Sequence, residues 1–364
     1  MRNKNIIFSF SILFLINTII ILFLEIIVRY YNIGNPSNKF LYNHIIPKRL
    51  PYYRFKNLKE NENIGFLNNH GFHDFDRELK NDYYRYAFLG DSFVEGLHVP
   101  RDSLFTNHLN RKFELNNMNS EALNFGMSGT GTGYQYKIWD HYIRTKVDIN
   151  HLVLCFFLGN DLENNSSYLG GPKENYSYFI DSKGSVILYG TERWLIRQWI
   201  SRLNNYSALT NTIYQRLYLL KREILKYKLK SFRNQKTDNN YKLNPNLVQT
   251  LDHDAWSNVV KGTLNLIARW NVELNSEEIK FSIVIIHPVE YYEKKTQFYN
   301  NYKNDFLKRL EKLSKKNNIN LAQIRLKDNY KKYFWSHYNY LGHTEVANQI
   351  YEKLIMKKDF SIHE

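Results

Sequence analysis

The chain has 364 residues, of which 43% are hydrophobic, enough to bury one large core and an appended smaller part. Its formal charge of +15 favours anionic partners such as acidic lipids or polysaccharides. It contains no zinc-finger spacing and no RNA-binding signature, so nucleic acid is not an expected partner. A single cysteine, Cys155, excludes an intrachain disulfide, and its place inside an apolar run predicts a small buried side chain.

An apolar stretch near the amino terminus predicts a membrane-spanning helix. Ile6–Leu24 is 19 residues long without a charge and follows Arg2 and Lys4. This length suits a bilayer. No small-residue cleavage site of the A-x-A kind follows the stretch, which favours an uncleaved anchor over residues 1–29 rather than a signal peptide. The two basic residues favour a cytoplasmic amino terminus, although further basic residues after the stretch weaken this bias.

The next two regions differ in pattern. Residues 30–80 are polar and aromatic without a clear period, and we expect a linker or cap there. In residues 81–364, short apolar runs alternate with amphipathic stretches, which predicts a mostly parallel, doubly wound sheet with helices on both faces. The predicted strands are Tyr84–Leu89, Glu121–Asn124, His151–Leu158, Phe281–Ile286 and Asn320–Ile324. The predicted helices are Leu104–Leu115, Tyr134–Thr145, Leu247–Leu274, Tyr302–Lys316 and Thr344–Met356.

An insertion at about residues 166–246 interrupts this alternation. Within it, Tyr176–Tyr189 predicts a hairpin that turns at Ser182-Lys183-Gly184. The insertion could form one wall of a ligand cleft or lie at an edge of the fold. Its remaining predicted parts are two helices, Trp194–Leu203 and Ala208–Tyr227, and a loose polar stretch, Lys236–Leu243.

Four short segments carry the residue types of a catalytic site. The first ends a predicted strand in a serine, and open α/β sheets hold their ligands at the carboxyl ends of their strands. A serine hydroxyl is a poor nucleophile until a base takes its proton, and histidine is suited to that task. The four segments, in chain order, are Gly90-Asp91-Ser92, Gly126–Gly133, Gly159-Asn160-Asp161 and Phe334–His343.

Together these segments resemble the SGNH/GDSL hydrolases, a family named for a serine, a glycine, an asparagine and a histidine in separate blocks. The resemblance implies a flavodoxin-like three-layer α/β/α fold. It implies Ser92 as the nucleophile and His337 as the general base. It also implies that the Ser92 and Gly129 amides and the Asn160 side chain donate to the oxyanion, which needs preorganised N–H groups.

The resemblance extends from about Asn68 to about Lys357 and is weakest in the insertion. Its first part, NNHGFHDFDRE, is similar to a stretch that precedes the serine block in many membrane-anchored bacterial members. Among twelve histidines, His337 is preferred because it opens an HxNxxGH string before the last predicted helix. Three others have different expected places: His98 on a loop, His287 near the pocket, and His343 packing or capping on that helix.

One position departs from the family pattern. An aspartate usually lies two or three residues before the histidine and orients its ring, but this chain has Trp335 and Phe334 there. Neither side chain can accept the Nδ1 proton. Three interpretations follow: a Ser–His dyad held by a backbone carbonyl, an acid such as Asp328 that folds in from elsewhere, or an inactive site.

No metal or cofactor is expected, because the chain has no HExxH, no paired cysteines and no GxGxxG or GK[ST] string. The resemblance implies a membrane-anchored serine ester hydrolase whose catalytic domain lies outside the cytoplasm. Its substrate would be an O-acylated carbohydrate of the cell envelope or another ester. One alternative is an O-acyltransferase that modifies an envelope polysaccharide, and another is an inactive glycan-binding scaffold of the same fold.

Overall fold

The computed structural model divides the chain into two compact units, residues 1–42 with 192–243, and residues 43–191 with 244–364. The residues that it describes are 2–30, 40–43, 46–49, 51–52, 54–57, 60–61, 63–78, 80–169, 178–188, 207, 209–210, 212–213, 216–217, 245–292, 301–326 and 329–356.

The first unit contains one long helix, α1 (Arg2–Tyr30). Its segment Ser11–Val28 has a mean hydropathy of 2.7 and is long and apolar enough to cross a membrane. A signal sequence near the amino terminus can pass the same test of length and composition. Glu25, the acid inside this helix, accepts hydrogen bonds from Ser207 Oγ and Leu209 N, both at 2.8 Å.

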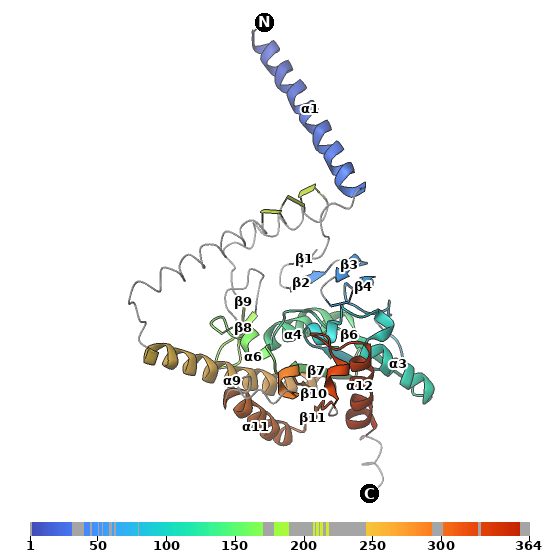
Figure 1. Ribbon diagram of the computed structural model, residues 1–364, viewed down its shortest axis with the longest axis vertical. Coiled ribbons are helices and arrows are strands. Elements are labelled where there is room, and N and C mark those ends of the chain that lie inside the picture. The colour runs from blue at the N-terminus through green and yellow to red at the C-terminus, as the bar shows by residue number, and fades with distance from the viewer. Residues whose placement is uncertain are drawn as a thin grey trace. The chain divides into compact units, whose positions relative to one another are not determined.

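A five-stranded parallel sheet forms the centre of the second unit (Figure 1). In spatial order its strands are β6 (Ser120–Asn124), β5 (Tyr84–Leu89), β7 (His151–Phe157), β10 (Lys280–Ile286) and β11 (Asn320–Gln323). Numbered by sequence, this order is 2-1-3-4-5, the flavodoxin-like doubly wound topology. The predicted mostly parallel sheet is therefore confirmed, and each predicted strand lies within two residues of its observed ends.

Helices cover both faces of the sheet, so the unit has three layers. Successive residues of β7 alternate between two buried clusters: Leu154 belongs to one, and Cys155 belongs to the other. This burial on both faces explains why the strand is an unbroken apolar run. The first cluster includes side chains of α4 (Thr132–Ile138), α9 (Pro245–Ser276) and α11 (Asn301–Lys316), and the second those of α3 (Phe105–Leu115) and α12 (Tyr340–Ile350).

Two helices differ from their predicted course. The predicted helix Tyr134–Thr145 is observed as α4, a π-helical stretch (Trp139–Ile143) and α5 (Arg144–Lys146). The last helix starts at Tyr340, earlier than predicted, because the Asn339 side chain caps it by accepting from Gly342 N at 3.1 Å. The remaining short helices of this unit are α2 (Ser92–Glu95), α6 (Asp161–Asn164), α10 (Val289–Tyr292), and the 3₁₀ or π turns Arg101–Ser103, Tyr330–Tyr333 and Tyr351–Ile355.

The predicted hairpin of the insertion is confirmed as β8 (Tyr178–Ile180) paired antiparallel with β9 (Val186–Leu188). Gly184 in its turn has φ +86°, a conformation that favours glycine. The predicted helix Trp194–Leu203 and the polar stretch Lys236–Leu243 lie outside the described residues. Of the predicted helix Ala208–Tyr227, the described positions 209–210, 212–213 and 216–217 are helical.

The region predicted as a linker or cap contains four short strands: β1 (Phe40–Asn43), β2 (Ile46–Arg49), β3 (Arg54–Asn57) and β4 (Asn63–Phe66). Strands β3 and β4 form an antiparallel hairpin. The chain then runs along the free edge of β6, where Asp74 accepts from Asn124 N at 3.0 Å and Arg77 pairs with Glu121 at 3.2 Å. These contacts cover a strand edge that would otherwise present unpaired backbone groups.

Candidate active site

The first block is a tight turn between β5 and α2. A Cβ atom on Gly90 would lie 2.3 Å from the Val94 side chain, so this close packing requires glycine. Asp91 is buried, and its Oδ1 accepts from Phe93 N at 2.9 Å, which caps the short helix. Burial raises the pKa of Asp91 to about 6, against the opposing effects of this hydrogen bond and of the His337 charge. The turn presents the partly exposed Ser92 at the carboxyl end of β5.

The fourth block forms a second turn, between the 3₁₀ turn Tyr330–Tyr333 and α12. Trp335 N donates to His337 O at 2.8 Å, and Phe334 forms an isolated β-bridge with Tyr338. This turn directs His337 toward the first block, where its Nε2 lies 2.9 Å from Ser92 Oγ. Two residues 245 positions apart in the sequence are therefore in hydrogen-bond contact, as expected for a nucleophile and its base.

The other nitrogen of the His337 ring, Nδ1, contacts a carboxylate that no motif in the sequence predicts. Glu60 Oε1 lies 2.6 Å from Nδ1, and Oε2 accepts from the His337 backbone amide at 3.1 Å. Burial acts to raise the pKa of Glu60, but hydrogen bonds from His337 and Ser336 and the charges of His337 and His98 outweigh it, and the pKa falls to about 2. An ionised carboxylate only accepts, so Nδ1 carries the hydrogen and the Nε2 lone pair faces Ser92.

Asp328, the acid suggested from sequence, lies outside the described residues. Among the described residues, Glu60 is the carboxylate in contact with Nδ1. Glu60 belongs to the loop between β3 and β4, in the region predicted as a linker or cap. No motif surrounds it, so no signal in the sequence could have identified it.

The second block packs directly on α2. A Cβ atom on Gly126 would lie 2.2 Å from Glu95 N, and Met127 N donates to Gly90 O at 3.0 Å. The buried carboxylate of Glu95 accepts from the amide of Ser128 at 3.0 Å and from its hydroxyl. Gly129 follows with φ +74°, where a Cβ atom would meet nothing within 4 Å, so backbone conformation alone requires glycine there.

The third block follows β7, the neighbour of β5 on the side away from β6. Asp161 is buried, and its Oδ2 accepts from Phe157 N at 2.9 Å, which fixes the turn. Lys303 of α11 donates to Gly159 O at 2.9 Å and pairs with Glu163 at 2.8 Å. The side-chain oxygen Oδ1 of Asn160 is buried and has no hydrogen-bond partner among the described residues. No contact of this oxygen therefore fixes the side chain.

The first three blocks lie together at the carboxyl ends of the strands, because β6, β5 and β7 are adjacent and parallel. Ser92 and His337 are in direct contact. Among the described residues no hydrogen bond joins Gly129 or Asn160 to Ser92, so their roles as oxyanion donors stay predictions.

Three other histidines have distinct surroundings. His98 lies on a turn as predicted, but it is buried: Nε2 contacts Tyr338 O at 2.6 Å, and its ring stacks on His337 at 5.0 Å. Burial lowers the pKa of His98 to about 4. His343 packs as predicted, fully buried, with Nδ1 accepting from Phe105 N at 3.3 Å. His287 is 1% exposed and stacks on a tyrosine, so it does not line an open pocket.

Ligand atoms of Glu60, His98 and His337 lie within 4.8 Å of one another, a grouping that could hold a metal ion. No metal is expected from the sequence, which has no HExxH and no paired cysteines, and these three residues form no motif along the chain. Each group already has a hydrogen-bond partner: Glu60 and His337 bind each other, and His98 binds Tyr338 O. Hydrogen bonding accounts for this grouping, and we assign no metal to it.

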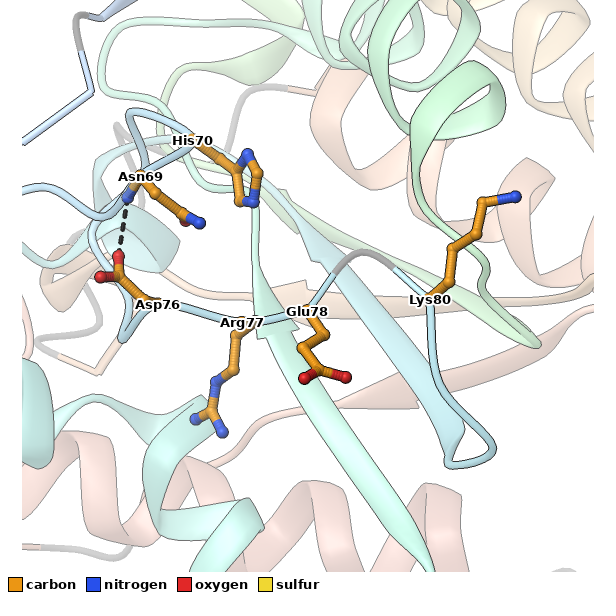
Figure 2. A pocket seen from close by; sticks show the side chains of 6 residues that line it. All are labelled: Asn69, His70, Asp76, Arg77, Glu78 and Lys80. Carbon is orange, nitrogen blue, oxygen red and sulfur yellow. Dashed lines mark hydrogen bonds between the residues drawn. The ribbon is translucent and has the colours of Figure 1, made fainter.

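A surface pocket of about 470 Å³ lies elsewhere, beside the segment that covers β6. Figure 2 shows its polar lining, in which Asn69 N donates to Asp76 at 2.7 Å. None of the four blocks contributes to it. Its lining residues are Asn69, His70, Asp76, Arg77, Glu78 and Lys80.

Comparison with protein-family models and with curated proteins found no match. Among solved structures, the chain is similar to the esterase EstA from Pseudoalteromonas sp., with 10% identity, 75% of this chain and 97% of that chain covered, and a TM-score of 0.42. It is similar to a lipolytic protein of the G-D-S-L family from Veillonella parvula (11% identity, 75% and 98% covered, TM-score 0.39). It is also similar to the acetyl xylan esterase AlAXEase (12% identity, 74% and 99% covered, TM-score 0.39). The solved structures that resemble this chain thus include esterases and a lipolytic protein of the G-D-S-L family.

Proposed function

We propose that the chain is a serine ester hydrolase of the SGNH/GDSL kind, in which Ser92 is the nucleophile and His337 the general base. The observation that carries this proposal is the 2.9 Å contact between His337 Nε2 and Ser92 Oγ. A hydroxyl paired with an imidazole at this distance is the arrangement that activates a serine.

The reaction has two halves. Ser92 Oγ attacks the ester carbonyl carbon while its proton passes to His337 Nε2, and a tetrahedral oxyanion forms. The oxyanion collapses, the ester C–O bond breaks, and the leaving alcohol takes the proton from His337. A water molecule then attacks the carbonyl carbon of the acyl–Ser92 ester and gives a proton to the same nitrogen. The bond between this carbon and Ser92 Oγ breaks, and Oγ takes the proton back from His337, which releases the carboxylic acid and restores Ser92.

The oxyanion needs N–H donors near the attacked carbonyl. We propose the amides of Ser92 and Gly129 and the side chain of Asn160 for this role. The positions of these donors support the proposal, because the three blocks follow adjacent parallel strands. The second block is also hydrogen-bonded to the Ser92 turn, through Met127 N and Gly90 O.

We propose that α1 anchors the protein in a membrane and that the catalytic unit lies outside the cytoplasm. The proposed substrate is an O-acylated carbohydrate of the cell envelope. The neighbours named above include an acetyl xylan esterase, and the net charge of +15 suits acidic surfaces. The inactive scaffold was suggested by the missing aspartate before His337, and the Glu60 carboxylate at Nδ1 removes that reason.

Hydrolysis of p-nitrophenyl acetate and of acetylated xylan tests the proposal. The wild-type protein should release acetate, and Ser92→Ala should lower kcat by about 10⁴-fold or more. Ser276→Ala, an exposed serine at the end of α9, is the matched control and should keep wild-type activity. A folded wild-type protein that hydrolyses neither ester, but acetylates an added polysaccharide from an acyl donor, would replace hydrolysis with acyl transfer.

A further inference from the structure

We propose that Glu60 is the positioning residue for His337, and that the β3–β4 hairpin supplies it in place of an acid within the histidine block. This inference rests on the proposed function, since it concerns the base of that reaction. It assigns a specific task to a segment that lies before the α/β region in the sequence.

The contact between Glu60 and His337 has the geometry of an orienting acid and its histidine. The Glu60 carboxylate holds His337 at two points, Nδ1 of the ring at 2.6 Å and the backbone amide at 3.1 Å. Two rings limit the remaining movement of the imidazole: His98 stacks on it at 5.0 Å, and Phe93 lies 4.9 Å away at 48°. This arrangement fixes both the tautomer and the direction of Nε2, which are the two tasks of the acid in a serine triad.

Two aromatic residues, Phe334 and Trp335, occupy the positions before His337 where an acid would ordinarily lie. Phe334 is 7% exposed and packs against the Tyr338 ring at 5.0 Å, so its position serves the core. Trp335 is 37% exposed, and its backbone closes the turn around His337. The local sequence therefore provides no acid, and the ring nitrogen is served by a residue 277 positions away.

The hairpin docks on the turn that follows α2, the short helix that begins with Ser92. Asn63 Nδ2 donates to Leu97 O at 3.0 Å and to Val99 O at 2.7 Å, on either side of His98. Phe55 packs in a small cluster with Leu67 and Leu97. The turn after α2 thus anchors the hairpin, and Glu60 is brought to His337 by the same contacts.

The experiment compares four variants: Glu60→Gln, Glu60→Ala, Glu60→Asp and the exposed control Glu114→Gln. Glu60→Gln and Glu60→Ala should lower kcat on p-nitrophenyl acetate by about 10²- to 10⁴-fold with little change in KM, because the ring loses its acceptor. Glu60→Asp should recover part of the loss, and the control should match the wild type. Thermal unfolding of each variant checks that the fold is retained.

A second readout separates this role from a structural one. The carboxylate stabilises the imidazolium that forms during the reaction, so Glu60→Gln should move the acid limb of the kcat/KM profile to lower pH. Among the described residues, Asp91, His98 and His343 also interact electrostatically with His337, and all variants keep them. Proton NMR should show a downfield Nδ1–H resonance in the wild type that disappears in Glu60→Gln and in His337→Gln.

The outcomes distinguish this inference from the proposed function. If the wild type hydrolyses the ester and folded Glu60→Gln has the same kcat and the same pH profile, Glu60 is not the positioning residue, although the hydrolase remains. If the wild type itself is inactive, the proposed function fails first. If Glu60→Ala does not fold, Asn63→Ala decides: it keeps the carboxylate and removes the hairpin anchor. Reduced kcat then supports the inference, and unchanged kcat contradicts it.

Discussion

Ser92 reaches the site from the end of a buried central strand, whereas Glu60 reaches it from a loop between two short strands outside the sheet. The serine turn is fixed by backbone contacts with α2 and with the second block, and Gly90 and Gly126 leave almost no space around it. The acid is held by Asn63 and by a cluster of Phe55, Leu67 and Leu97. The proposed nucleophile therefore follows a strand of the core, and the proposed positioning acid depends on a small docked element.

The difference has a general basis. A side chain at the end of a central strand is displaced only when the core unfolds, so its position is as stable as the whole unit. A side chain on a small hairpin can lose its place when a few contacts break, without global unfolding. Substitutions in this protein should therefore reduce activity in three separable ways. They can remove a reacting group, lower the stability of the whole unit, or detach the β3–β4 hairpin from the turn after α2.

On the chemical side, a large effect that is smaller than the loss of Ser92 is expected at Asn160, the proposed side-chain donor to the oxyanion. Asn160→Ala should lower kcat by about 10²- to 10³-fold, because one N–H donor to the transition state is removed. KM should change little, since the donor acts mainly on the developing charge. A variant with wild-type kcat would remove Asn160 from the site and leave the third block a purely structural role.

Two apolar truncations sharpen the contrast between sheet and hairpin. Leu154→Ala, in the centre of β7, should lower the free energy of unfolding by about 2–5 kcal/mol, while the folded fraction keeps its kcat. Phe55→Ala should change the free energy of unfolding little, because it weakens only the docking of the hairpin. Its kcat should fall to a value close to that of Glu60→Ala. Urea unfolding and steady-state kinetics on the same samples measure both. Equal losses of stability in the two variants would show that hairpin and sheet unfold as one unit.

The smallest expected effect is a pH dependence of stability. The pKa of Glu60 lies at about 2 in the folded protein, below its ordinary value of 4.5. A lowered pKa stabilises the fold at pH values above the ordinary one, and this contribution is lost as pH falls from about 4.5 toward 2. Glu60→Gln should therefore be less stable than wild type at neutral pH and equally stable near pH 2. A difference that persists at the lowest pH would assign the loss to packing instead of charge.

The sheet could be predicted because its strands are near-continuous apolar runs, such as His151–Phe157, and such runs are typical of strands buried on both faces. Ser92 and His337 could be predicted because each lies in a motif next to a recognisable element. The π-helical stretch Trp139–Ile143 could not, since its residues continue the helical periodicity of α4.

Glu60 could not be predicted for a different reason. Its region has no hydrophobic period, and its partner is 277 residues away, so nothing local to either residue marks the contact. The family pattern predicts an orienting acid just before His337, where this chain has Phe334 and Trp335, and Asp328 is a nearby alternative. The contact follows from the docking of the hairpin on the turn after α2, which is a tertiary property.

The most direct test of the account is peptide mapping of the folded protein after treatment with a fluorophosphonate. The pairing of Ser92 Oγ with His337 Nε2 predicts a single phosphonate adduct on the peptide that contains Ser92, absent in Ser92→Ala and formed much more slowly in His337→Gln. An unlabelled folded wild-type protein, or an adduct on a different serine, would contradict the assignment of Ser92 as the nucleophile.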